Sequence, residues 1–93
     1  MKLISNAKYG QPVESGSIFR AKAGTMEITI HKYMGCEGWF LTCHDLGIEA
    51  MELKSESLIQ ATKESGEILK KTIAKIQKNI EKFCDSKVEI ARC

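Results

Sequence analysis

The chain has 93 residues, of which 43% are hydrophobic and 28% are charged, and its formal net charge is +2. This length predicts one domain, because most domains contain roughly 100–150 residues. One proline and seven glycines argue against a disordered or low-complexity chain. A net charge this small does not by itself demand a nucleic-acid partner.

The hydropathy of the chain indicates a protein without a membrane partner. The N-terminal segment lacks the apolar core of a signal peptide, and no stretch approaches the ~20 apolar residues of a membrane span. We therefore expect a cytoplasmic protein. In that reducing compartment, thiols are expected rather than disulfides. This expectation covers the four cysteines Cys36, Cys43, Cys84 and Cys93.

The first half of the chain reads as an N-terminal arm followed by a β-meander. Residues 1–24 form the arm, with a turn at Pro12 and a short strand over 17–22. Residues 25–54 form the meander, beginning with a strand in which Met26, Ile28 and Ile30 alternate with polar residues. A glycine-containing turn leads to a second strand over 39–44, and a weaker alternation over 48–54 predicts a third.

A long amphipathic helix is expected over residues 55–84. Ser57, followed three residues later by Gln60, fits a capping box. Residues 87–91 alternate again and predict a short final strand. The predicted fold is therefore α+β, with an antiparallel sheet of three to four strands, a β-β-β-α-β core order, and one long C-terminal helix packed on the sheet.

The helix is predicted to overhang its own sheet. About 28 residues at 1.5 Å each span roughly 40 Å, whereas a domain of this size is only about 25–30 Å across. The large apolar residues of its second half then need a cover, which is the N-terminal arm, a second copy of the chain or a different protein. The predicted partner contacts are Leu69, Ile73, Ile76, Ile80 and Phe83. Trp39 joins them if it is exposed and is a core residue otherwise.

A row of lysines runs along the same helix at spacings of i, i+4, i+7 and i+11. Its members are Lys71, Lys75, Lys78 and Lys82. Such a row suits a phosphate backbone or an acidic protein face. It is also what an ordinary solvated helix carries near its C-terminus, where lysines favour the helix dipole.

The residues that invite a metal or catalytic interpretation do not have the required spacing. His31, Cys36, Cys43 and His44 lack the two close pairs typical of zinc sites. Neither a nucleophile elbow nor a glycine-rich phosphate loop is present. We predict no catalytic residue, no metal and no cofactor, with Cys43 as a core thiol and the other three as surface or turn residues.

Residues 26–71 resemble the HicB-type domain, the antitoxin half of bacterial HicA–HicB modules. The similar segments are Trp39-Phe40-Leu41-Thr42-Cys43-His44-Asp45-Leu46-Gly47-Ile48 and Ser57-Leu58-Ile59-Gln60-Ala61. The family usually has proline where His44 stands. The resemblance implies a partial RNase H-like fold without nuclease activity, and a domain that oligomerises and binds a protein.

These observations lead to one hypothesis and one alternative. The hypothesis is a non-enzymatic regulator or inhibitor that masks a partner's functional surface. It would be a HicB-like antitoxin, or a phage or mobile-element protein that inhibits a host defence or nucleic-acid-processing protein. Its partner is then a toxin or host protein, and a homodimer is open. The alternative is a small nucleic-acid-binding protein that uses the lysine row.

Overall fold

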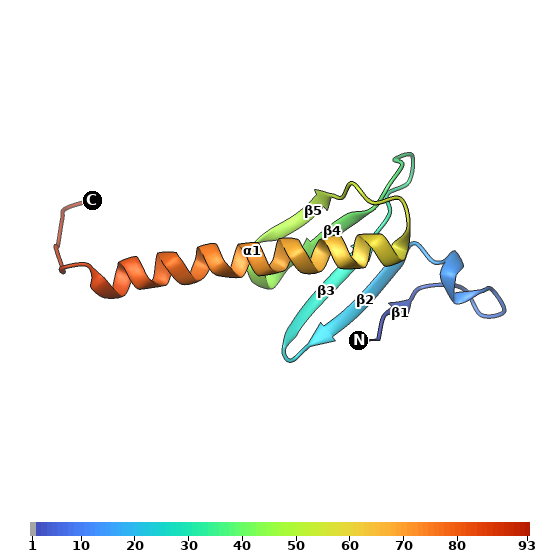
Figure 1. Cartoon of the computed structure of the whole chain (residues 1–93), viewed down its shortest axis with the longest axis horizontal. Coiled ribbons are helices and arrows are strands. Elements are labelled where there is room, and N and C mark those ends of the chain that lie inside the picture. Colours follow the sequence, from blue (N-terminus) through green and yellow to red (C-terminus); the bar gives the residue numbers. More distant parts are fainter. Residues whose placement is uncertain (1) are drawn as a thin grey trace.

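The alternating segments of the first half pair into an antiparallel sheet. The structure, a computed structural model, describes residues 2–93. Five strands lie in the order β1-β2-β3-β4-β5, so each strand pairs with its neighbour in the chain (Figure 1). They are β1 (Ile4–Ser5), β2 (Ile18–Ala23), β3 (Met26–His31), β4 (Phe40–Cys43) and β5 (Ile48–Glu52). The α+β prediction is confirmed, with five strands in place of three to four.

The core lies between one face of this sheet and the first half of the helix α1 (Leu58–Asp85). Phe19 pairs with Ile30 across β2 and β3, and Ile30 pairs with Leu41 across β3 and β4. This register aligns three buried side chains in a row across the sheet. Ala61 and Leu69 of α1 belong to the same buried cluster, so the row is the surface on which the helix packs.

The start of α1 is fixed by two side chains. The Oγ of Ser57 accepts a hydrogen bond from the backbone N–H of Gln60 at 3.2 Å, which confirms the predicted N-cap. The carboxylate of Glu64 accepts hydrogen bonds from the backbone N–H groups of Lys54 and Ser55 and from the Ser55 hydroxyl, at 2.7–3.0 Å. Glu64 therefore ties the second turn of the helix to the loop that follows β5.

The second half of α1 extends well beyond the sheet, as predicted from its length (Figure 1). The principal extents of the molecule are 60 × 28 × 23 Å. The side chains of α1 that are buried are Ala61, Ser65 and Leu69, all in the first half. From Ile73 to Asp85 every residue is exposed. Within residues 2–93, no helix combines the length and the apolar character needed to cross a membrane.

The N-terminal arm does not cover this overhang. The Oδ1 of Asn6 accepts hydrogen bonds from the backbone N–H groups of Ser17 at 2.8 Å and Ile18 at 3.0 Å, so the arm folds back beside β2. Gly16 completes this contact, because a Cβ there would lie 2.8 Å from the same Asn6 oxygen. In Figure 1 the arm lies at the end of the molecule opposite to the overhang.

The strand predicted over residues 87–91 is wrong, and so is the final β of the β-β-β-α-β order. These residues belong to neither a helix nor a strand. The helix ends at Asp85, far beyond the sheet, so the segment that follows has no strand within reach. Its apolar residues Val88 and Ile90 are exposed. A segment with an alternating pattern forms a strand only where a neighbouring strand is available to hydrogen-bond with it.

Candidate functional site

A row of exposed large apolar side chains lies on the overhanging half of α1. We call Ile73, Ile76, Ile80 and Phe83 the exposed stripe; their exposed fractions are 46%, 37%, 56% and 81%. At 3.6 residues per turn all four lie within about 40° of Leu69 around the helix axis. The stripe therefore continues the side of α1 that packs on the sheet, past the point where the sheet ends.

Of the residues named as partner contacts, Leu69 is part of the core instead, and Trp39 takes the core position that was its alternative. Leu69 is 9% exposed because it still lies over the sheet, and Trp39 is 5% exposed. The Trp39 ring packs against Phe19 with a centroid separation of 5.7 Å, and its Nε1–H donates to the carbonyl of Glu56 at 3.2 Å. The Nζ of Lys32 lies 4.6 Å from the centre of the same ring. Neither side chain can reach a partner without leaving the core.

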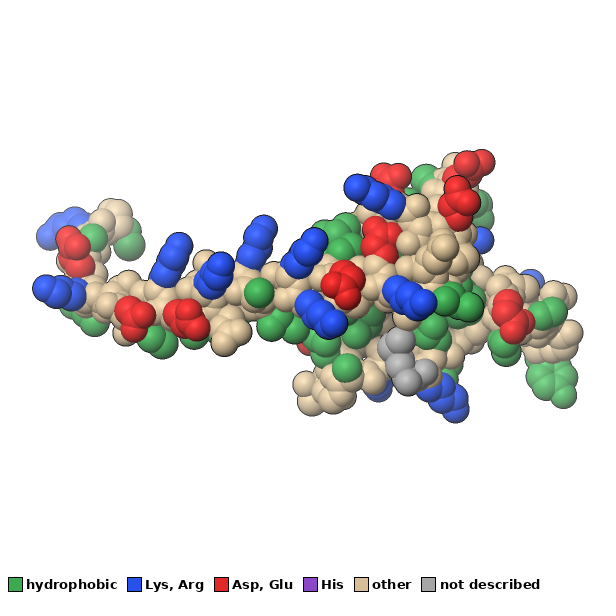
Figure 2. Space-filling view, viewed as in Figure 1, with side chains coloured by type: hydrophobic (Ala, Val, Ile, Leu, Met, Phe, Trp, Pro, Cys, Tyr) green, Lys and Arg blue, Asp and Glu red, His purple; other side chains and the backbone are tan. Residues whose placement is uncertain are grey.

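The lysine row lies on the other side of the same helix. Lys71, Lys75, Lys78 and Lys82 are exposed, and none of them forms an ion pair with any residue from 2 to 93. Their angular positions are roughly opposite to the exposed stripe. Figure 2 shows basic side chains along one side of the overhang, and hydrophobic side chains with acidic ones among them along the other. The overhang is thus an apolar surface backed by a basic one.

The residues that border the exposed stripe were missed by the sequence interpretation. From Leu69 to Phe83 the apolar residues recur at alternating intervals of four and three, which is the spacing of the a and d positions of a coiled coil. The e and g positions on either side of the stripe itself are then uncharged. They are Thr72, Gln77, Asn79 and Cys84. The sequence signal for these flanking positions is the average spacing of the apolar residues, which is about 3.5 residues. Over a stretch this short, that spacing is hard to distinguish from the roughly 3.6 residues of an ordinary amphipathic helix.

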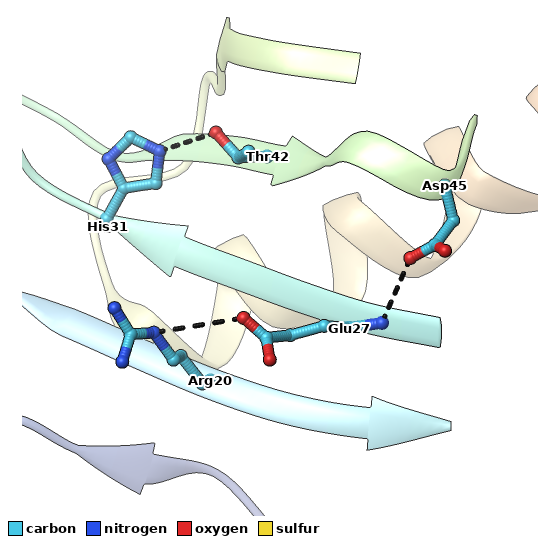
Figure 3. Close-up of polar contacts among 5 residues, drawn as sticks. All are labelled: Arg20, Glu27, His31, Thr42 and Asp45. Carbon is cyan, nitrogen blue, oxygen red and sulfur yellow. Dashed lines mark hydrogen bonds and ion pairs between the residues drawn. The ribbon is translucent and has the colours of Figure 1, made fainter. Parts of the chain in front are cut away.

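A second candidate surface is the open face of the sheet, opposite to α1. Here a groove is lined by polar side chains of β2, β3 and β4 and of the 3-10 turn η2 (His44–Leu46). Arg20 Nε lies 4.0 Å from Glu27 Oε1, and the backbone N–H of Glu27 donates to Asp45 Oδ2 at 3.2 Å (Figure 3). Both contacts join residues of the chain itself, so a ligand in the groove would compete with them.

His31 lines this groove and is buried, whereas a surface position was expected. Its Nε2 lies 2.8 Å from Thr42 Oγ1, which also accepts a hydrogen bond from the backbone N–H of Ala50 at 3.0 Å. The Thr42 hydroxyl therefore has its own proton free to donate to an unprotonated Nε2. Burial lowers the pKa of His31 below its usual 6.5, against a smaller opposing effect of a backbone hydrogen bond with Lys32. Burial thus favours the neutral imidazole, and its contact with Thr42 links β3 to β4.

The sulfur and imidazole groups do not converge. Cys43 is buried in the core, as predicted, while Cys36, Cys84 and Cys93 are exposed; all four are free. Residues 2–93 contain no group of three or more His, Cys, Asp or Glu side chains placed to hold a metal ion.

Comparisons with known proteins give no relative for this arrangement: no protein-family model, no curated protein and no solved structure matches the chain.

Proposed function

We propose that this chain is a non-enzymatic protein-binding module that acts by covering a functional surface of another protein. The observation that supports the proposal is the exposed stripe on the part of α1, from Ile73 to Asp85, in which every residue is exposed. Burying a large apolar side chain contributes roughly 1.5–3 kcal/mol. Four such side chains aligned on one helix are typical of a helix that docks into a partner.

The HicB-like resemblance suggests the class of partner. On that proposal the partner is a toxin, or a host defence or nucleic-acid-processing protein if the chain comes from a phage or mobile element. The proposed contacts are those of the exposed stripe; the lysine row lies on the opposite side of the same helix and takes no part in this contact.

A pull-down from the source cell tests this function with two matched baits. The first bait carries Ile76→Asp and Ile80→Asp, which place two charges in the exposed stripe. The control carries Lys71→Asp and Lys78→Asp, which place the same new side chains on the opposite side of the same helix. We expect a protein that binds the wild-type and control baits and is lost with the stripe variant. Equal capture by all three baits would contradict the proposal.

The second candidate function, nucleic-acid binding, is favoured by the four unpaired lysines in one row. It predicts that the chain binds RNA or DNA, and that the logarithm of the association constant falls linearly with the logarithm of the salt concentration. The slope is set by the number of phosphates contacted. The Lys71→Asp, Lys78→Asp variant should then bind more weakly, while the stripe variant binds normally. A wild-type chain with no measurable binding at low salt removes this candidate.

A further inference from the structure

We propose that the exposed stripe is occupied by a second copy of this chain, and that the two copies of α1 pair antiparallel. The inference rests on the proposed function, in that it takes the stripe as a protein-binding surface, and it names what occupies the stripe while no other protein is bound. Its basis is the heptad spacing, which makes Ile73 and Ile80 a positions and Ile76 and Phe83 d positions. This pattern is typical of helices that pack against other helices by knobs into holes.

The charges around the exposed stripe favour a second copy over an acidic partner. Lysines at the e and g positions would repel their counterparts in a pair of identical helices. The positions that flank the stripe are uncharged, and the lysine row falls at the c and f positions on the far side. Lys70 is the one lysine at an e position, and it lies at the domain end of the overhang, 3.7 Å from Glu67. The basic helix can therefore pair with itself without bringing its lysine rows together.

The position of the sheet decides the orientation. The stripe continues the side of α1 that packs on the sheet, so a parallel partner helix would run directly into that sheet. In the antiparallel orientation the partner helix instead passes beyond Asp85, where no helix or strand of the described residues stands in its way. Figure 1 shows that beyond the end of α1 only the short C-terminal segment follows.

The antiparallel pairing has a defined register. Ile73 packs against Phe83 of the second copy, and Ile76 against Ile80 of the second copy. The two-fold axis therefore crosses between the helices at the level of Lys78, whose side chain points away from the pair. Gln77 then faces its own counterpart, and so does Asn79. Both lysine rows remain on the outside of the pair.

Light scattering on the purified full chain over a range of concentrations tests the pairing. We expect a species with twice the 10.4 kDa of one chain, which dissociates on dilution because the contact is only about two heptads long. The Ile76→Asp, Ile80→Asp variant should stay at the mass of one chain, and Lys75→Asp, Lys82→Asp should still pair. Circular dichroism and thermal unfolding of both variants check that the domain remains folded.

The outcomes distinguish this inference from the proposed function. A wild-type chain that stays monomeric at all concentrations overturns the inference, while loss of a captured protein with the stripe variant would leave the proposed function standing. A dimer that survives Ile76→Asp, Ile80→Asp uses another surface and also overturns it.

Cysteine cross-linking tests the orientation. In a background where the three exposed cysteines are changed to serine, Asn79→Cys should form an intermolecular disulfide on oxidation, because this position faces itself across the two-fold axis. Thr72→Cys is the matched control: it is also a g position, but it faces the region of Ser86 in the second copy and should not cross-link. Cross-linking by neither variant, or equally by both, would refute the antiparallel register.

Discussion

Leu69 and Ile73 lie one turn apart on the same side of α1, yet Leu69 is 9% exposed and Ile73 is 46% exposed. The edge of the sheet falls between them. Leu69→Ala should therefore lower the free energy of unfolding by about 2–4 kcal/mol, whereas Ile73→Ala should lower it by less than about 1 kcal/mol in the monomer. Urea denaturation measures both losses of unfolding free energy, at a protein concentration low enough for the chain to be a monomer. Equal losses would show that the overhang packs on the domain after all.

The Glu64 carboxylate should contribute measurably to stability through its contacts with the loop before α1. Its pKa is lowered, first by the hydrogen bond from the Ser55 hydroxyl and then by the backbone N–H of Lys54. Glu64→Gln removes the charge and places an amide next to these donors. We expect it to lower the free energy of unfolding by about 1 kcal/mol. This is less than the value for buried charged hydrogen bonds, because the group is partly exposed.

Glu67→Gln is the control for this prediction. Glu67 makes only an exposed ion pair with Lys70 at 3.7 Å, so its loss should cost less than about 0.5 kcal/mol. The Glu64 contribution should be complete above pH 4.5 and decline as the pH falls through the lower pKa of the folded state. If the two variants are equally stable, the loop contact contributes little.

Stability should decrease as the pH falls below about 6.5, because of His31. The folded chain keeps this imidazole neutral while the unfolded chain protonates it, so the unfolded state binds more protons in that range. One proton limits the slope to at most about 1.4 kcal/mol per pH unit. Denaturant unfolding between pH 7.5 and 5 measures it, and His31→Gln should remove the dependence. A slope that is unchanged in His31→Gln must come from another group.

Two serines of the helix region should respond to alanine with opposite signs. Ser65 is buried, and its hydroxyl has no hydrogen-bond partner among the described residues. Ser65→Ala should therefore stabilise the domain by about 1 kcal/mol, since it removes an unsatisfied group and improves helix propensity. Ser57→Ala should destabilise it by a similar amount, because the N-cap is lost. Thermal unfolding of the two variants measures these changes in stability. A loss of stability with Ser65→Ala would indicate that the Ser65 hydroxyl has a hydrogen-bond partner.

Features that depend on a few neighbouring residues could be predicted from the sequence, and features that depend on distant parts of the chain could not. The alternation from Met26 to Ile30 and the Ser57 cap act over a few residues, and both are observed as predicted. The helix periodicity identified which side of α1 is apolar, but it could not separate Leu69 from Ile73, because only the width of the sheet distinguishes them. The strand predicted over 87–91 failed for the same reason, since pairing depends on what lies nearby in space.

Side chains that bond to backbone groups of distant loops were also invisible in the sequence. Glu64 looks like any exposed helix glutamate until the loop after β5 brings two N–H groups against it. His31 looked like a surface residue because it alternates with buried neighbours, but Thr42 and the aromatic ring of Phe40, with a centroid separation of 6.0 Å, enclose it.

The overhang couples the formation of the helix to its burial. Residues 73–85 make up about 20 Å of helix, and a peptide of that length is only marginally helical in water. In the free chain, the overhang stays helical because it continues the packed half of α1. Unwinding of the helix from Asp85 inward therefore competes with association. Binding strength should then depend on residues that never touch the bound protein. Ala74, on the outer side of the helix, would contribute to affinity only through the helical turns that it helps to keep formed.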